Sequence, residues 1–379
     1  MSNNHDHQDG YDYIIVGAGS AGCVLANRLS EEQYSVCLIE AGPQDTSQLI
    51  KIPAGIAALI QWRKYNWSFN SQAETSLAER KLYCPRGKTL GGSSAINAMV
   101  YIRGQKEDYQ RWLKNGVKGW GYDDLLPYFK RTMCQQAPRQ QPYSAEYHGY
   151  QGELSVCDIA DPQTISQDFV CAAQQAGYSA NHDFNGQQQE GIGLYQATIK
   201  QGERHSCAHA FLHPILKRKN LTLLTGKRTA RIRLNQGIAI GIELVDGTII
   251  HAHKEVIISA GALQSPQLLM LSGIGDKAEL TKHHIPCLIE NTEVGKNLQE
   301  HVDVVVVNRA KDKRIKQNAI SFSPQILCRG VKEAWTYYRY KRGLFSSSLI
   351  EAGGFIKSSP KQKTPDLQLM LTPALFNDH

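Results

Sequence analysis

The chain has 379 residues, 41% of them hydrophobic and 20% charged, which is the balance of an ordinary soluble globular protein long enough for two domains. Its net charge is +7, but the basic residues are scattered and no basic repeat carries interleaved aromatic residues, so we expect no nucleic-acid partner. The longest apolar stretch, Ile52–Ile60, is too short to cross a bilayer.

Cysteine usage and the polar N-terminus favour a cytoplasmic protein. The nine cysteines are dispersed, odd in number and never spaced as CxxC, which is typical of reduced thiols and argues against a cysteine zinc site. His5, Asp6 and His7 form at most a weak chelating tail, and we expect no metal site. The basic charge allows association with the inner face of a membrane, although a solvated basic surface is the interpretation that we favour.

The most informative pattern lies at the start of the chain. Residues 12–16 predict a strand, and a glycine turn and the start of a helix follow. Gly17 allows the tight turn, Gly19 allows the backbone to approach a pyrophosphate, and Gly22 allows the helix to pack on the strand. The pyrophosphate would lie at the positive helix N-terminus near Ser20.

A second strand, Val36–Glu40, ends in an acid. Glu40 lies 18 residues after Gly22 (40 − 22), which is close to the spacing expected for an acid that binds the ribose hydroxyls. Strand, glycine turn, helix and acidic strand end together predict an adenine-dinucleotide site rather than a chance glycine loop.

A second glycine loop, Arg86–Gly104, follows an irregular stretch. Gly91, Gly92, Ser93 and Ser94 suit a loop whose backbone amides face a ligand, although a glycine turn before a core element is equally compatible. Further on, residues 108–130 read as helix, turn and helix, and their aromatic residues are expected in a core.

Residues 221–259 change to strand patterns. A meander is predicted from four segments, 221–225, 230–232, 238–245 and 248–251, with Asp246-Gly247 as a hairpin turn. A separate apolar strand is predicted to begin at Val256. Its small-residue turn precedes a helix with Pro266 in the first turn. A second strand-to-helix crossing after a meander is typical of a two-part FAD domain, whereas a plain NAD-binding domain more often continues with βα units.

Several separated motifs resemble those of the GMC (glucose–methanol–choline) flavin oxidoreductases, and the bacterial alcohol and choline dehydrogenase branch in particular. The resemblance runs nearly from end to end. The matching segments are Gly17–Gly22 with Glu40, Gly87–Asn97, Tyr101–Gly104, His182–Gly186, Ser259–Gly275 and Val294–His301.

The resemblance implies FAD-dependent oxidation of an alcohol to an aldehyde, with hydride transfer to flavin N5. The implied cofactor-binding residues are Gly17, Gly19, Ser20, Ala21, Gly22, Glu40, Gly91, Gly92, Ser93, Ser94, Asn97, Val100 and Thr229. Some members attach FAD covalently through a histidine just before the asparagine. That position is Ile96 here, so noncovalent FAD is expected, with a small-molecule alcohol as substrate and a quinone as one acceptor that fits this branch.

The expected fold class is α/β, with a Rossmann-like FAD-binding domain that includes a β-meander. A partial antiparallel sheet is expected in the α+β substrate domain. We assign residues 10–150 and 215–300 to the FAD-binding domain, and residues 151–214 and 301–379 to an incomplete substrate-binding domain.

No catalytic residue is assigned within the chain. The family's catalytic histidine pair would lie beyond His379, and His301 is read as structural, so these 379 residues are expected to be inactive alone. The alternatives are a choline dehydrogenase, with Glu351 as one candidate acid near the substrate, a truncated or vestigial flavin-binding protein, and an NAD-dependent dehydrogenase. The last leaves the second glycine loop unexplained.

Overall fold

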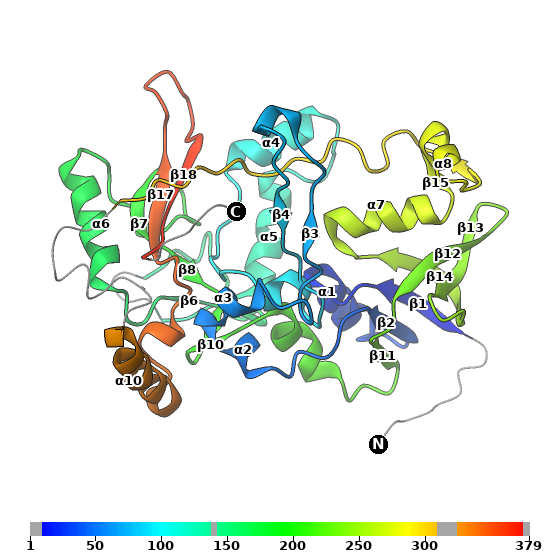
Figure 1. Ribbon diagram of the computed structural model, residues 1–379, viewed down its shortest axis with the longest axis horizontal. Helices are drawn as coiled ribbons and strands as arrows, with labels where there is room; N and C mark the ends of the chain where they lie inside the picture. The colour runs from blue at the N-terminus through cyan, green and yellow to red at the C-terminus, as the bar shows by residue number, and fades with distance from the viewer. Residues whose placement is uncertain (1–9, 138–141, 309–323, 374–379) are drawn as a thin grey trace. The chain divides into compact units, whose positions relative to one another are not determined.

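The computed structural model describes residues 10–137, 142–308 and 324–373 of the chain (Figure 1). The chain divides into two compact units, which are treated separately below. Unit 1 comprises Met1–Thr46, Leu59–Ile96 and Ser206–Val304, and unit 2 comprises Ser47–Ala58, Asn97–His205 and Val305–His379. The division into FAD-binding and substrate-binding domains made from the sequence stays a prediction.

Unit 1 is built on a six-stranded sheet of order β11-β2-β1-β14-β13-β12. Its strands are β1 (Tyr11–Val16), β2 (Val36–Glu40), β11 (Leu221–Thr225), β12 (Thr229–Asn235), β13 (Ile238–Leu244) and β14 (Ile249–Ile258). The first four in this order are parallel, and β13 and β12 extend the sheet antiparallel. This sheet confirms the predicted α/β class and the meander that extends it.

The centre of this sheet is fully buried because its strands carry continuous apolar runs. Ile14, Ile15 and Leu38 have no exposed surface, which is typical of parallel strands covered on both faces. Helix α1 (Ser20–Leu29) connects β1 to β2, as the glycine pattern predicts. The β1–α1–β2 unit therefore forms where the sequence places it.

Two strand predictions are wrong. The separate strands expected at 248–251 and from Val256 are one strand, β14. Its polar middle pairs with β1, where Tyr11 lies opposite Ala252 and Tyr13 lies opposite Glu255. Residues 221–225 form β11, which pairs parallel with β2 and is not part of the meander. In both cases the partner strand decides the pairing, and this information is absent from the local pattern.

Helix α7 (Gly261–Leu271) also differs from its prediction. It begins four residues before Ser265, so Pro266 lies inside the helix rather than in its first turn. Its last turn is joined to the edge strand β12 by one hydroxyl: Ser272 Oγ accepts the Ile232 N–H at 2.8 Å and donates to the Leu268 carbonyl at 2.6 Å.

The described part of unit 2 contains two three-stranded sheets and a two-stranded sheet of β9 (Ile199–Lys200) and β10 (Glu203–Arg204). β7 (Gly191–Leu194), β17 (Ala352–Ile356) and β18 (Leu367–Leu371) form an antiparallel sheet, and Figure 1 shows them side by side. The second sheet joins β5 (Met133–Gln135), β6 (Leu154–Asp158) and β8 (Gln196–Ala197). Unit 2 therefore contains an antiparallel sheet of the kind predicted for the substrate domain, and the assignment of unit 2 to that domain stays a prediction.

Helices α4 (Lys106–Lys114) and α5 (Tyr122–Thr132) confirm the predicted helix pair. The prediction that their aromatic residues lie in a core is only partly right. Tyr109 is buried among other rings, but Trp112 and Trp120 are 44% and 53% exposed. Within the part of the chain that the structure describes, no helix is long and apolar enough to span a bilayer.

The remaining elements are shorter helices and strands and the long helix α10. They are α2 (Gln48–Lys51), η1 (Pro53–Gly55), α3 (Ile56–Leu59), β3 (Phe69–Asn70), η2 (Thr75–Leu77), β4 (Tyr83–Cys84), η3 (Gly92–Ala95), α6 (Thr164–Gln175), β9 (Ile199–Lys200), β10 (Glu203–Arg204), η4 (Ala208–Leu212), η5 (His213–Ile215), β15 (Ile274–Gly275), α8 (Lys277–Lys282), β16 (Ile289–Glu290), α10 (Pro324–Tyr340) and η6 (Leu344–Ser346).

Replacing the hydroxyl that joins α7 to β12 tests this packing. Ser272→Ala should lower the free energy of unfolding by about 1–3 kcal/mol, because it leaves the buried Ile232 N–H without an acceptor. The matched control is Thr281→Ala, since Thr281 donates the same kind of hydrogen bond to Lys277 on an exposed helix. Urea unfolding followed by circular dichroism measures both, and equal midpoints for the two variants would contradict the prediction.

Candidate functional site

The first glycine loop of unit 1 is held by close backbone contacts. Gly17 has φ +102°, and a Cβ there would lie 2.6 Å from the Ser259 carbonyl oxygen. A Cβ at Gly22 would lie 1.9 Å from the carbonyl oxygen of Gly17. The Ser259 hydroxyl donates to the same Gly17 carbonyl at 2.7 Å. Only glycine fits both positions without moving the strand end or the helix.

The N-terminus of α1 faces a cavity of about 500 Å³, and Gly19, Ser20 and Ala21 line it. Gly19 is the N-cap residue, no side chain caps the helix, and its first turn carries no acid. The first amide groups of a helix have no partner within it, and the helix dipole adds partial positive charge there. This end of α1 therefore suits an anionic group such as a pyrophosphate.

Glu40 lines the same cavity at the end of β2. It is only 6% exposed, and each carboxylate oxygen accepts a backbone N–H: Oε2 from Ala18 at 2.9 Å and Oε1 from Gly42 at 2.8 Å. Burial raises the pKa of the Glu40 carboxyl above its usual value, although the two amide hydrogen bonds oppose that shift. Each oxygen retains acceptor capacity for a ligand hydroxyl.

The second glycine loop lies directly on the first. The Gly91 amide donates to the Ala18 carbonyl at 2.8 Å. Gly92 has φ +53°, and a Cβ there would lie 2.8 Å from the Gly19 Cα. Gly92 and Ser93 line the cavity, whereas Ser94 holds the loop by donating to the Gly91 carbonyl and accepting the Cys207 N–H.

The sequence reasoning missed several basic and aromatic side chains of the cavity. Arg86, Lys227 and Arg228 line it with Trp67, and the Arg228 guanidinium lies 5.4 Å from the centre of the Trp67 ring. Lys227 pairs with the exposed Asp246 at 2.8 Å. These cations add positive charge to a cavity that already contains a helix N-terminus. Their signal in the sequence was weak because they come from three separate segments, with only Lys227 and Arg228 adjacent in the chain.

The turn after β14 and the start of α7 complete the lining, since residues 259–265 contribute to it. Eight predicted cofactor-binding residues line the cavity together. They are Gly17, Gly19, Ser20, Ala21, Glu40, Gly92, Ser93 and Thr229. Gly22, Gly91 and Ser94 lie behind this lining and position the two glycine loops.

Asn97 and Val100 belong to unit 2. The Asn97 side chain accepts a hydrogen bond from the buried Arg204 at 2.8 Å, and Val100 packs against a small cluster around Phe184. Their role toward a cofactor stays a prediction.

Glu351 was a candidate acid near the substrate, and the structure removes it from that role. It has no exposed surface, and its oxygens accept hydrogen bonds from the Gln163 N–H and from the hydroxyls of Ser166 and Ser347. A carboxylate with this many internal donors joins segments of unit 2 and does not face a substrate.

The sequence model of the GMC oxidoreductase family matches residues 11–303. An alcohol dehydrogenase [acceptor] of Pseudomonas putida is 45% identical, over 97% of this chain and 66% of its own length. The mitochondrial choline dehydrogenase of Homo sapiens is 39% identical, over 99% of this chain and 63% of its own. The chain thus spans slightly less than two thirds of the length of these relatives.

Solved structures with the same fold include two oxidases. A pyridoxine 4-oxidase from Mesorbium loti superposes with a TM-score of 0.68 and 35% identity, over 74% of this chain and 55% of that one. A formate oxidase superposes with a TM-score of 0.79 and 26% identity, over 91% of this chain and 61% of that one.

The contact between the two glycine loops gives a direct test. The control variant is Gly237→Ala. Gly237 has φ +81° and no atom lies near the position of its Cβ, so the substitution should lower the free energy of unfolding only by the backbone penalty of about 1–2 kcal/mol. Gly92→Ala adds a collision with the Gly19 backbone and should cost clearly more. Urea unfolding of both variants measures the difference, and equal losses would show that the loops do not depend on this contact.

Proposed function

The chain belongs to the GMC oxidoreductase family, and on that premise we propose that the cavity of unit 1 holds FAD and that the whole protein oxidises a primary alcohol. The observation that carries the proposal is the cavity itself, in which two glycine loops, the uncapped end of α1 and Glu40 meet. Its volume lies within the range common for ligand cavities, about 300–1,000 Å³, and its chemistry suits an adenine dinucleotide.

Each part of the cavity is proposed to hold one part of the cofactor. The amides at Gly19, Ser20 and Ala21 bind the pyrophosphate, and the basic side chains nearby add charge. Glu40 accepts hydrogen bonds from the adenosine ribose, because it lines the cavity and two backbone amides fix its carboxylate there. The Thr229 backbone lies beside the adenine, as the family resemblance implies.

The second glycine loop is proposed to lie along the flavin. Bound FAD would accept a hydride from the alcohol α-carbon at flavin N5, while the hydroxyl proton passes to a base and the product is an aldehyde. The cofactor is proposed to be noncovalent, because Ile96, at the position where some members carry the linking histidine, is a buried apolar residue without a nucleophile.

A primary aliphatic alcohol is the substrate that we favour, with choline as the alternative. The sequence similarity to the P. putida enzyme supports the first, and the similarity to choline dehydrogenases supports the second. The buried position of Glu351 removes the one acid that the sequence offered for a quaternary ammonium group. A quinone as electron acceptor and peripheral contact with a membrane are further parts of this proposal.

These 379 residues are proposed to bind FAD without catalysing turnover. The family resemblance places the catalytic histidine pair beyond His379, so the base that removes the hydroxyl proton would come from a longer form of the protein. The alternative is a non-catalytic flavin-binding protein, which the lack of the histidine pair within these 379 residues also favours.

Flavin content and turnover test these proposals together. We expect the purified 379-residue chain to be yellow and to release all of its FAD into the supernatant on acid precipitation. Dye-linked oxidation of butanol or choline should stay at background. Flavin that remains in the pellet would contradict noncovalent binding, a colourless but folded chain would contradict the cofactor assignment, and turnover would contradict the missing base.

A further inference from the structure

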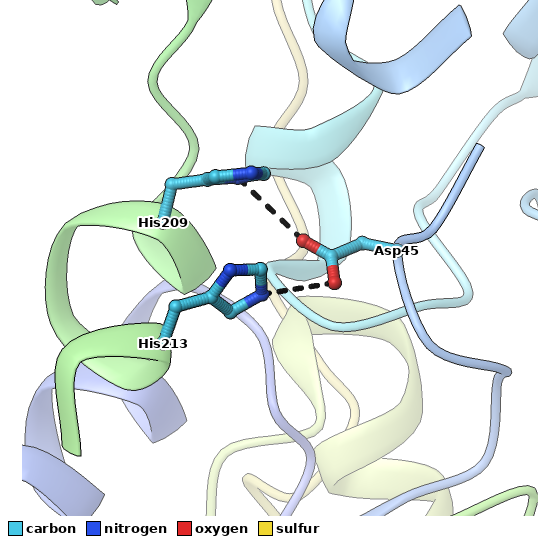
Figure 2. Close-up of side chains that lie close together, drawn as sticks. All are labelled: Asp45, His209 and His213. Carbon is cyan, nitrogen blue, oxygen red and sulfur yellow. Dashed lines mark hydrogen bonds and ion pairs between the residues drawn. The ribbon is translucent and has the colours of Figure 1, made fainter. Parts of the chain in front are cut away.

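Three side chains of unit 1 meet at a point that the dinucleotide cavity does not include. Asp45, His209 and His213 each place a ligand atom so that all three atoms lie within 4.8 Å of one another. Figure 2 shows both imidazole rings directed at the carboxylate from the same helical segment. None of the three residues lines the cavity described above. The prediction from the sequence was that the chain has no metal site, although these two histidines are spaced four residues apart.

The local fold explains why the rings meet. His209 lies in the short π-helix η4 and His213 begins η5 directly after it. A spacing of four places both side chains on one face, and the ring centres are 4.4 Å apart. Asp45 follows β2 in a loop that runs past this face. Asp45 Oδ1 lies 3.0 Å from His213 Nε2, and Asp45 Oδ2 lies 3.6 Å from His209 Nδ1.

The carboxylate carries the decisive observation. Asp45 is only 4% exposed, yet its Oδ2 atom has no hydrogen-bond partner among the described residues. A buried carboxylate oxygen without a donor is costly, so such an atom requires an explanation. A cation between the three side chains supplies one.

We propose that Asp45, His209 and His213 bind a divalent transition-metal ion of the Zn²⁺ class. Two imidazoles and one carboxylate suit such an ion in both charge and ligand type. Metal–ligand distances of about 2.0–2.2 Å in a tetrahedron place ligand atoms about 3.3–3.6 Å apart. The His213 Nε2–Oδ1 distance of 3.0 Å is slightly shorter than this spacing, and the His209 Nδ1–Oδ2 distance of 3.6 Å lies at its upper limit.

The remaining coordination position is open to water. The side chains of His209 and His213 are 24% and 34% exposed, so solvent reaches the outer side of the cluster. The Ser206 hydroxyl lies 3.1 Å from His209 Nδ1, and its hydrogen can rotate to another acceptor when a metal takes that nitrogen. The ion would join the loop after β2 to η4.

Cobalt binding tests the site, because tetrahedral Co²⁺ absorbs visible light and replaces Zn²⁺ readily. The chain is prepared without an affinity tag, treated with chelator and titrated with Co²⁺. We expect one equivalent to bind with d–d absorption and to raise the thermal unfolding midpoint. His213→Gln and Asp45→Asn should each weaken binding at least tenfold, with circular dichroism checking the fold.

Two controls separate this cluster from other histidines. His283→Gln removes an exposed histidine that pairs with Glu279 and should leave binding unchanged. His5→Gln with His7→Gln removes the chelating tail and should also leave it unchanged. Loss of the signal in the tail variant, or full affinity in both site variants, would overturn the proposal.

A third variant, which should gain a new absorption band, tests the proposal even if the two site variants fail to fold. His209 presents Nδ1, the ring nitrogen nearer the backbone, so a cysteine sulfur can take its place. His209→Cys should therefore bind Co²⁺ with a new thiolate-to-cobalt charge-transfer band in the near ultraviolet. Absence of that band in a folded His209→Cys chain, or failure of the unaltered chain to bind Co²⁺, would overturn the proposal without reference to flavin or turnover.

Discussion

Direct contact between backbone segments is the constraint on which the cavity of unit 1 depends. The turn after β1 lies so close to Ser259, and the second loop so close to Gly19, that no Cβ fits at Gly17, Gly22 or Gly92. Because the chain segments touch without side chains between them, the backbone is accessible at the glycine positions that line the cavity, Gly17, Gly19 and Gly92. An anion can then approach the first turn of α1 closely.

The same arrangement fixes the charges around the cavity. Glu40 is buried at the end of β2, where its charge is stabilised by the amides of Ala18 and Gly42. Ala18 and Gly42 flank the two strand ends, so the carboxylate also joins the turn after β1 to the loop after β2. Positive charge from the α1 N-terminus, Lys227 and Arg228 lies around this single acid. Such a distribution favours a ligand with both phosphates and hydroxyl groups.

The sequence predicted the parts of the fold that local patterns determine. The β1–α1–β2 unit, the hairpin at Asp246-Gly247 and the helix pair α4–α5 depend on residues within a few positions of one another. The continuity of β14 and the pairing of β11 depend on β1 and β2, which lie more than 180 residues away in the chain. The start of α7 was predicted too late because proline is favoured in the first turn of a helix but is not confined to it.

The candidate sites divide in the same way. The first glycine loop and Glu40 have the spacing that a dinucleotide site requires, so the sequence was sufficient to predict them. Trp67, Arg86 and Arg228 come from three separate segments and meet only after the sheet has formed, so no local pattern marked them as parts of one site. His209 and His213 had a local signal in their spacing, but it gained meaning only when the fold brought Asp45 to the same point.

The buried carboxylates of the described residues show why Asp45 differs from the others. Glu40 and Glu351 are also almost fully buried, and each has donors on both of its oxygens, from backbone amides or from hydroxyls. The fold therefore supplies donors where it buries an acid, whereas Asp45 faces two imidazoles and keeps one oxygen without a hydrogen bond. Two neutral imidazoles with a shared cation satisfy that oxygen and both ring nitrogens at once. An ordinary Asp–His hydrogen bond would leave one of these atoms without a partner, whereas one metal ion satisfies all three.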